Sequence, residues 1–500
     1  MDAAEEIAHE TPAKGVSGKI AIALAFGSSA AVLVLELVAL RLVAPYLGLT
    51  LETNTAVIGV ALAAIATGAA MGGRLADRMP PTRTLGPIVM SAGALVLLIL
   101  PAVRWTGETV RGGGADLVFL VVAAALFLPA ALLAAVTPMV TKLRLSTLAQ
   151  TGTVVGRLSA WATVGAIVGT VLTGFVFVAQ VPTSVIVLCL GGLLVVAGAV
   201  LTVYFRGLKA AARPLVLALI GTGLTVAAPR PCEVETAYHC ARVVHDPERA
   251  GGRILYLDQL RHSYVDLDDP THLEFGYTKN FAAAIDSRWP DKSPLEVLHI
   301  GGGGLTMPHY LTATRPGTGN KVYEIDPGVI ELDKAELGAR PGPHLDLRVR
   351  DGRLGVRSEQ TDSRDLIVMD AFGGVAVPWH LTTREIVADI RRVLEPDGLY
   401  LANIIDFGPQ AFVKAGIRTI AAEFPYVGVI AEPSALAGRT GGNFVLVAAD
   451  QPLPGTAIRR RYGADGYLDD PAALRQFIGD APLLTDDYAP VDQLLTPAAN

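Results

Sequence analysis

Apolar residues fill the first half of the chain in segments long enough to cross a lipid bilayer. The run from Leu158 to Phe205 contains no charged residue, and a polar break at 180–183 divides it into two segments. A helix rises about 1.5 Å per residue, so roughly 20 apolar residues span a bilayer core. The pattern therefore predicts a multi-pass α-helical membrane domain over 18–230 with about six or seven helices, at 18–44, 54–73, 84–103, 115–140, 155–179, 183–205 and the short segment 214–229.

From about Tyr238 the apolar runs become short and alternate with glycine, proline and aspartate. The segments 253–258 and 261–267 have the pattern of a hairpin, so 231–290 is predicted to form a linker and a small N-terminal β flap. Buried-strand patterns then alternate with helical ones. This order predicts an α/β doubly wound domain over 291–500, of the Rossmann type found in S-adenosylmethionine methyltransferases.

The distribution of charge supports this division into two halves. The 500 residues are 51% hydrophobic and 18% charged, but only 18 charged residues lie between 15 and 229, against 65 from 230 to 500. The remaining five lie in the first 14 residues, so 1–17 is predicted to be a polar tail, and it lacks the pattern of a cleavable signal peptide. The net charge of -6 argues against a nucleic-acid partner, which would need a basic face.

Basic residues predict the orientation of the membrane half. Lysine and arginine follow the second, fourth and sixth predicted helices, whereas the loops at 45–53 and 180–183 contain neither. The basic loops and the N-terminus should therefore be cytoplasmic. The side of the soluble half depends on whether 214–229 spans. If it does, Cys232 and Cys240 lie in an oxidising compartment and could pair; otherwise they are free thiols. Three cysteines without paired metal spacing predict no metal site.

Two features of the membrane half favour transport as an alternative function. Glu36 lies within the first apolar segment, where a charge is costly unless it is paired, for example with Arg41. The segment 72–78, which contains Asp77, resembles the loop motif of major-facilitator transporters. Either feature is also compatible with a purely structural role.

The soluble half carries glycine or carboxylate at the end of four successive predicted strands. The first strand ends at Gly301–Gly304, which permits close approach of a ligand to the backbone. Glu324 follows Gly303 by 21 residues, the spacing at which a carboxylate accepts both hydroxyls of a ribose. The third strand ends at Asp351–Gly352, suited to an adenine amino group, and the fourth at Asp370. Ligands bind at such strand ends in open α/β sheets.

These residues resemble the spermidine synthases, the polyamine aminopropyltransferases. The resemblance rests on 300–303, 324–326, 351–352 and 365–372 and covers about 250–450, while the apolar half resembles the membrane-fused branch of that family. It implies Asp370 as the catalytic residue and decarboxylated S-adenosylmethionine as co-substrate, without a metal. The donor-binding residues that it implies are His262, Gly301, Gly302, Gly303, Glu324, Asp326, Asp351 and Gly352. His262 stands where soluble relatives usually have glutamine.

The sequence departs from the family pattern where the diamine should bind. Gly304 replaces the aspartate that follows the three glycines, 373–375 lacks a second aspartate, and Tyr277–Lys279 replaces Tyr-His-Glu. Tyr277, Asp269 and Asp487 are therefore the candidate residues for binding the acceptor. Other acidic residues that could substitute are Asp266, Asp268 and Asp486.

The resemblance implies a multi-pass cell-membrane protein that transfers an aminopropyl group to a diamine such as putrescine, giving spermidine and methylthioadenosine. Its expected partners are the diamine or polyamine, the nucleoside donor and the lipid bilayer, with a possible homo-oligomer. Two alternatives stay open. One is another S-adenosylmethionine-type transferase, such as a methyltransferase. The other is a polyamine transporter with a nucleoside-binding soluble domain.

Overall fold

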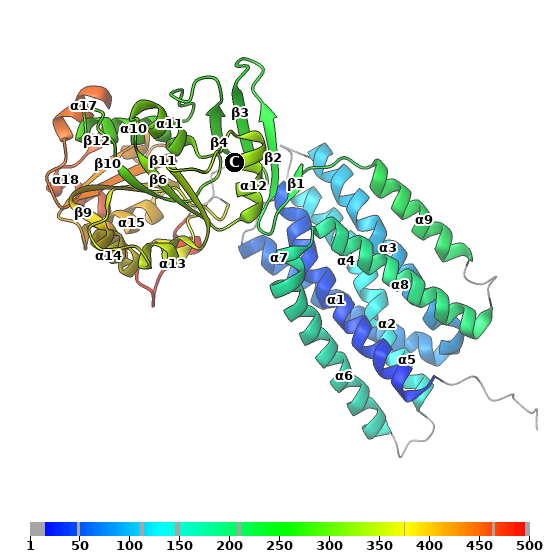
Figure 1. Ribbon diagram of the computed structural model, residues 1–500. Coiled ribbons are helices and arrows are strands. Elements are labelled where there is room, and N and C mark those ends of the chain that lie inside the picture. The colour runs from blue at the N-terminus through cyan, green and yellow to red at the C-terminus, as the bar shows by residue number, and fades with distance from the viewer. Residues whose placement is uncertain are drawn as a thin grey trace, which may run out of the picture. The chain divides into compact units, whose positions relative to one another are not determined.

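The chain divides into two compact units, Met1–Pro231 and Cys232–Asn500, which are described separately below (Figure 1). The structure is a computed structural model. It describes residues 16–47, 51–110, 115–145, 151–207, 212–374, 376–462 and 466–495. Most of the predicted polar tail, 1–17, lies outside these ranges.

The helical unit is a bundle of long apolar helices. Its elements are α1 (Gly18–Leu47), α2 (Leu51–Arg78), α3 (Pro81–Val110), α4 (Ala115–Ala134), α5 (Val136–Arg144), α6 (Thr151–Leu172), the π-helical turn η2 (Thr173–Phe177), α7 (Val178–Gln180), α8 (Thr183–Arg206) and α9 (Ala212–Ala227). Within the described ranges, six helical stretches are long and apolar enough to cross a membrane. The 16-residue α9 is not among them.

One predicted helix is divided in the structure. The segment expected as a single helix over 115–140 forms α4 and α5, which meet at Ala135. Pro138 lies just after this break. A proline has no amide hydrogen, and its ring crowds the carbonyl four residues earlier, here that of Ala134. The division therefore has a local chemical cause that an average of hydropathy does not detect.

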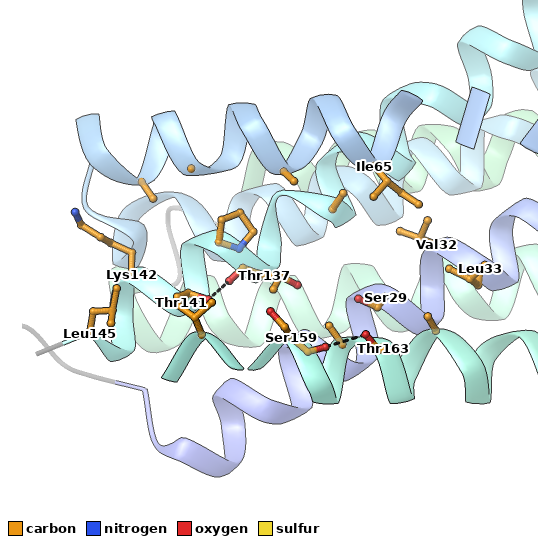
Figure 2. Close-up of a pocket in the computed structure, with 18 of the residues that line it drawn as sticks. Ser29, Val32, Leu33, Ile65, Thr137, Thr141, Lys142, Leu145, Ser159 and Thr163 are labelled. Carbon is orange, nitrogen blue, oxygen red and sulfur yellow. Dashed lines mark hydrogen bonds between the residues drawn. The ribbon is translucent and has the colours of Figure 1, made fainter. Parts of the chain in front are cut away.

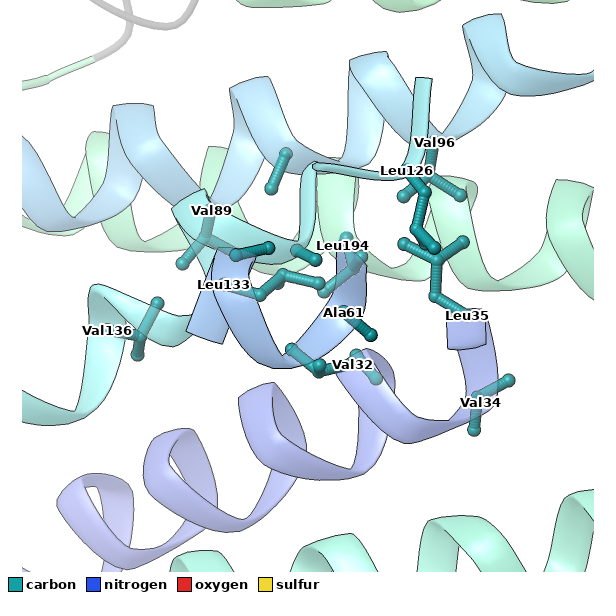
Figure 3. Packing of buried hydrophobic residues seen from close by; sticks show 14 of the residues in the cluster. Val32, Val34, Leu35, Ala61, Val89, Val96, Leu126, Leu133, Val136 and Leu194 are labelled. Carbon is teal, nitrogen blue, oxygen red and sulfur yellow. The ribbon is translucent and has the colours of Figure 1, made fainter. Parts of the chain in front are cut away.

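Small residues let the helices of this unit approach closely. A Cβ at Gly68 of α2 would overlap the carbonyl of Ala131 in α4, and a Cβ at Gly165 of α6 would overlap that of Phe26 in α1. The helical unit also has a core of buried aliphatic side chains. Figure 3 shows Leu35, Val96 and Leu126, from α1, α3 and α4, packed in this cluster. Helices in an apolar solvent associate through such close packing.

The second unit begins with a small antiparallel sheet. Its strands β1 (Val234–Glu235), β2 (Cys240–His245), β3 (Gly252–Leu257) and β4 (Leu260–Asp266) pair in sequence order. This sheet confirms the predicted hairpin. A disulfide joins Cys232 to Cys240 at the start of the unit, while Cys189 in α8 is a free, exposed thiol.

The main sheet has the doubly wound topology that the sequence predicts. Strands β5 (Glu296–Ile300), β6 (Gly319–Glu324), β7 (Leu345–Val349), β8 (Arg364–Met369) and β9 (Leu394–Asp406) are parallel, and β10 (Tyr426–Ile430), β11 (Gly442–Ala449) and β12 (Tyr467–Leu468) extend the sheet antiparallel. The strand order is β12-β10-β11-β9-β8-β5-β6-β7. The order therefore reverses between β5 and β8, which is where ligands bind in such folds.

Helices cover both faces of this sheet (Figure 1). On β5, Leu298 and Ile300 pack in one buried cluster with α14 and α15, whereas Val297 packs in a second cluster with α10 and α11. Alternate side chains of a strand point to opposite faces, so both faces are buried. The helices are α10 (Gly276–Arg288), α11 (Thr306–Thr314), α12 (Pro327–Glu336), α13 (Gly352–Arg357), η4 (Trp379–Leu381), α14 (Arg384–Val393), α15 (Ala411–Ala421), α16 (Pro433–Leu436), α17 (Gly455–Tyr462), α18 (Pro471–Ile478) and α19 (Val491–Leu494).

Candidate active site

The ends of β5 and β8 meet at the point where the strand order reverses. The Asp370 amide donates a hydrogen bond to the Ile300 carbonyl at 2.9 Å, which places Asp370 directly beside Gly301. Gly301 has φ +97°, and a Cβ there would overlap the Asp370 carbonyl. Only glycine fits this position, because both the backbone angle and the space exclude a side chain.

Asp370 is held by a chain of polar side chains. Asn403 of β9 donates from Nδ2 to the Asp370 carboxylate at 3.0 Å, and Asn443 of β11 donates in turn to the Asn403 side-chain oxygen at 3.1 Å. The Tyr277 hydroxyl donates to the same carboxylate. Burial raises the pKa of Asp370, while the hydrogen bonds from Asn403 and Tyr277 lower it. Such a carboxylate is oriented and is more basic than an exposed one.

A cleft of about 600 Å³ opens above Asp370. Its lining includes the polar side chains of Tyr277, Asn403 and Asn443 and the aromatic rings of Phe275, Phe372 and Phe407. Two further carboxylates, Glu274 and Glu432, also line it, together with one cation, Arg261. The lining therefore combines apolar walls with an excess of negative charge, which suits a molecule that has a methylene chain and more than one positive charge.

A smaller polar cavity adjoins this cleft, and His262, Tyr277 and Asp370 line both. His262 and His299 line that cavity with Thr278 and the glycine turn. Burial lowers the pKa of both histidines to about 4. The His299 Nε2 lies 3.0 Å from the Asn320 side-chain oxygen. Both rings are therefore neutral near pH 7 and serve as hydrogen-bonding groups rather than cations.

Glu324 lies at the end of β6, below the glycine turn. Its two carboxylate oxygens accept hydrogen bonds from the amides of Gly302 at 2.7 Å and Asp326 at 2.8 Å. Burial raises the pKa of this carboxyl. Each carboxylate oxygen has a second lone pair available, so the contact with Gly302 leaves acceptor capacity beside the turn.

The neighbouring Asp326 has a structural role. Its carboxylate accepts from the Gly328 amide at 2.9 Å, as the N-cap of α12, and from the Thr236 hydroxyl. Asp326 is almost completely buried. Both oxygens thus have partners within the fold, which leaves a donor-binding role for Asp326 without support in the geometry.

Asp351 and Gly352 follow β7, one strand further from Asp370. The Asp351 carboxylate caps α13 through the Leu354 amide at 2.9 Å and lies 3.1 Å from His380 Nε2. A Cβ at Gly352 would lie 2.5 Å from the Ile300 side chain, so glycine lets α13 pack against β5. Gly302 and Gly303 similarly leave room for Glu324 and His262.

Gly304 is enclosed on both sides and has no room for the family's aspartate. Its φ is +79°, and a Cβ would overlap the Ser263 hydroxyl. Its amide donates to the Asp333 carboxylate at 2.9 Å. Burial raises the pKa of Asp333 well above the usual range, while the hydrogen bond from the Gly304 amide lowers it. No sequence pattern singles out Asp333.

The acidic residues expected to replace the family's diamine ligands lie away from the cleft. Asp269 accepts from the amide and hydroxyl of Thr271, and Asp266 binds Arg249 at 2.6 Å. Asp268 is an exposed residue of the same turn, Asp486 pairs with Arg353, and Asp487 is exposed on a turn near the C-terminus. Of the three candidate acceptor ligands, only Tyr277 lines the cleft. The prediction for Asp269 and Asp487 is therefore not supported by their positions.

The polar lining residues that the sequence did not indicate include Glu274, Asn403, Glu432 and Asn443. Asn403 carried a signal, since it is the one polar residue in the apolar run 399–405. The others reach the cleft from the segment before α10, from the start of α16 and from the start of β11. Glu432 and Asn443 reach the cleft through the antiparallel strands β10 and β11, which the sequence did not predict. Across the described ranges, no cluster of three potential metal ligands is found.

Comparison with known proteins identifies relatives of this chain, although no family model matches it. A polyamine aminopropyltransferase from Chromobacterium violaceum is 28% identical over 172 residues, which are 34% of this chain and 64% of that protein. One from Pyrobaculum calidifontis is 32% identical over 165 residues, 30% of this chain and 53% of the relative. The chain thus spans about half to two thirds of these relatives' lengths.

A solved structure is also similar to part of this chain. A probable spermidine synthase from Corynebacterium glutamicum is 27% identical to this chain and superposes with a TM-score of 0.47. The match covers 53% of this chain and 98% of the solved chain. The sequence relatives establish that the chain resembles the spermidine synthase family.

Proposed function

We propose that this protein is an aminopropyltransferase that moves the aminopropyl group of decarboxylated S-adenosylmethionine to a diamine such as putrescine. The observation that carries the proposal is the position of Asp370, which lies beside Gly301 where the strand order reverses and is oriented by Asn403 and Tyr277. The curated relatives, named polyamine aminopropyltransferases, support the same reaction class.

The reaction needs a deprotonated amine placed in line with the donor. The sulfonium of the donor makes the adjacent aminopropyl carbon electrophilic. The amine nitrogen forms a bond to that carbon, the carbon–sulfur bond breaks with its electron pair going to sulfur, and methylthioadenosine leaves. Asp370 accepts the proton released by the attacking nitrogen. Its raised pKa favours this step, and the cleft contributes by holding the two reactants in line.

The donor side is supported by three groups around the glycine turn. Gly301 to Gly303 leave the backbone accessible to a nucleoside, and Glu324 retains lone pairs next to Gly302 for the ribose hydroxyls. Asp351 is available for the adenine amino group, because its carboxylate is partly exposed. His262 lies against Gly303 and, being neutral, can donate or accept a hydrogen bond.

The acceptor side is supported by the charge of the cleft. Putrescine is a dication near neutral pH, and Glu274, Glu432 and Asp370 exceed the single charge of Arg261. The Arg261 guanidinium lies over the Phe275 ring at 5.4 Å, on the cleft wall. Phe372 and Phe407 offer apolar surface to the methylene chain. In this proposal, Glu274 and Glu432 bind the ammonium groups of the diamine in place of the carboxylates that positions 304 and 373 lack.

One observation favours a second candidate, transfer of a methyl group from S-adenosylmethionine. Gly304 and 373–375 lack the carboxylates expected to bind a diamine, and a Cβ at Gly304 would overlap the Ser263 hydroxyl. An acceptor other than a diamine would not need those carboxylates. The sheet and the glycine turn serve either donor.

The helical unit supports a membrane anchor. Six of its described stretches are long and apolar enough to span a bilayer. We therefore place the protein in the cell membrane, with the α/β unit attached through the segment after α9.

A product assay on the purified full-length protein in lipid nanodiscs distinguishes the two transferases. Given decarboxylated S-adenosylmethionine and putrescine, the protein should release methylthioadenosine and spermidine. The Asp397→Asn variant, which changes an exposed carboxylate in the turn of β9, should retain this activity. Release of S-adenosylhomocysteine from S-adenosylmethionine, with no methylthioadenosine for any diamine, would refute the aminopropyl assignment.

A further inference from the structure

The helical unit contains a cavity of about 560 Å³ between α1, α2, α5 and α6 (Figure 2). Close helix contacts lie on two of its sides. Gly72 of α2 lies against Ala135, and Gly169 of α6 lies against Ala30 of α1. The cavity therefore separates two tightly packed helix pairs, and its shape is set by backbone contacts rather than by flexible side chains.

Hydroxyl groups gather in the middle of this cavity. They come from Ser29 of α1, Thr137 and Thr141 of α5, and Ser159 and Thr163 of α6. Figure 2 shows these side chains around the same space, with Lys142 and Leu145 toward one end and Ile65, Val32 and Leu33 toward the other. Alanine and aliphatic side chains form the rest of the lining.

Two of these hydroxyls have already donated their hydrogen. Thr141 Oγ1 donates to the Thr137 carbonyl at 2.9 Å, and Thr163 Oγ1 donates to the Ser159 carbonyl at 3.1 Å. A hydroxyl has one hydrogen to donate and two lone pairs to accept. What these threonines can still offer to a bound molecule is therefore acceptor capacity.

A further acceptor comes from the break between α4 and α5. Pro138 has no amide hydrogen for the carbonyl four residues earlier, which belongs to Ala134, and both residues line the cavity. A backbone carbonyl without its helical donor is costly in an apolar surrounding unless another donor reaches it. The cavity thus favours a molecule that donates hydrogen bonds.

The charge at one end of the cavity is balanced by a single ion pair. Among the described residues that line it, only Asp77 and Lys142 are charged, and Lys142 Nζ lies 2.8 Å from the Asp77 carboxylate. Both side chains are largely exposed, which makes this pair weak and easily exchanged. A mobile cation could displace Lys142 from Asp77 at little cost.

We propose that this cavity is a binding site for a protonated aliphatic amine, with Asp77 as its charge partner and the threonine and Ala134 oxygens as acceptors. The methylene chain of such an amine lies along the alanine and aliphatic walls. The site is separate from the cleft of the α/β unit, and it needs no transferase activity. It gives the helical unit a ligand of its own in addition to an anchoring role.

Photolabelling of the full-length protein in nanodiscs tests this site. The probe is a putrescine derivative with a terminal diazirine, and mass spectrometry locates the attachment on each unit. Attachment should occur on α5 or α6 and be competed by spermidine. Ala162→Phe, which fills the cavity from α6, should abolish it, whereas Val164→Phe, an exposed position on the same helix, should leave it unchanged.

Substitutions of Asp77 and Lys142 should change the labelling in opposite directions. A purely structural role of their ion pair would not produce opposite changes. Asp77→Asn should weaken labelling about tenfold, because it removes the charge partner, while Lys142→Gln should strengthen it by removing the competitor. Methylthioadenosine release should stay the same in all four variants, and unchanged hydrogen exchange in α5 and α6 would show that their helical unit is folded. Labelling confined to the α/β unit, equal labelling in Ala162→Phe and Val164→Phe, a failure of spermidine to compete, or a loss with both ion-pair variants would overturn the proposal. A lipid chain in the cavity would produce the third of these outcomes.

Discussion

The two units each contain a cavity, and the two cavities have similar volumes, about 560 Å³ in the helical unit and 600 Å³ in the α/β unit. Their linings differ. The helical cavity offers hydroxyls and one exposed ion pair, whereas the cleft of the α/β unit offers Asp370 with a raised pKa and oriented amide donors. The first lining can hold a molecule, while the second can also remove a proton. The volume of a cavity therefore does not indicate its chemistry. Here the chemistry depends on the burial and the hydrogen-bond partners of the Asp370 carboxylate.

Glycine serves different purposes in the two units. In the helical unit, Gly68, Gly72 and Gly165 bring helix backbones together. In the α/β unit, Gly301 and Gly304 adopt positive φ angles at the turn beside Asp370. Substitutions at these positions separate the stability of one unit from the activity of the other.

The largest effect should come from Asp370→Asn. Asparagine preserves the shape of the side chain but cannot accept the proton, so kcat should fall by about 10² to 10⁴. Steady-state release of methylthioadenosine measures this loss. Diamine binding by the helical cavity should not change. Near-normal kcat in Asp370→Asn would exclude Asp370 as the base.

Gly301→Ala should destabilise the α/β unit by about 2 to 4 kcal/mol, because the new Cβ meets both an unfavourable φ and the Asp370 carbonyl. Chemical denaturation, monitored by hydrogen exchange in β5 and β8, would measure this loss in the free energy of unfolding. Gly373→Ala is the matched control, since its Cβ would meet no atom within 4 Å. Equal stability of the two variants would contradict the close contact at the strand ends.

In the helical unit, two adjacent glycines form a matched pair. A Cβ at Gly72 would lie 2.6 Å from the Ala135 Cα, whereas one at Gly73 would meet nothing within 4 Å. Gly72→Ala should therefore lower the stability of the bundle by about 1 to 3 kcal/mol, and Gly73→Ala should be neutral or mildly stabilising. Exchange rates in α2 and α4 test the difference. Methylthioadenosine release should stay constant, and a parallel loss of activity would show that the units are coupled.

The smallest expected effect is on the pH dependence of the reaction. Asp370 must be deprotonated to act as a base, so kcat/KM should fall as the pH drops through its pKa, which burial raises. Tyr277→Phe removes a hydrogen bond that favours the carboxylate and so raises this pKa further. At pH values below the pKa of Asp370, kcat/KM of Tyr277→Phe should be about two- to tenfold lower than that of the unmodified protein. This factor corresponds to a lost hydrogen bond of about 0.5 to 1.5 kcal/mol. The exposed Tyr426→Phe serves as the control, and an unchanged acid limb in Tyr277→Phe would argue against the contact.

The sequence predicts the fold well because hydropathy and strand-end glycines are local signals. Helix α1 covers the predicted 18–44, and strands β5 to β8 end at the expected glycines and carboxylates. The break before Val136 was missed, since a proline alone does not predict it. Pro45, Pro87, Pro101 and Pro129 all lie inside unbroken helices.

The site was harder to predict because partners come from distant parts of the chain. Asp326 is bound by Thr236, 90 residues earlier, and Asp486 by Arg353, 133 residues earlier. A carboxylate after a strand can cap a helix or bind a ligand, and the sequence does not distinguish these uses. Glu274 and Glu432 were overlooked for the converse reason, since each is an unremarkable acidic residue until the sheet and α10 bring it to the cleft.

The disulfide between Cys232 and Cys240 has a practical consequence. The chain contains three cysteines, so with this bond intact Cys189 is its single free thiol, and it is exposed on α8. A maleimide fluorophore would therefore attach at one known position in the helical unit without any mutagenesis. The native protein thus carries its own site for a spectroscopic reporter of amine binding, while the α/β unit remains unlabelled.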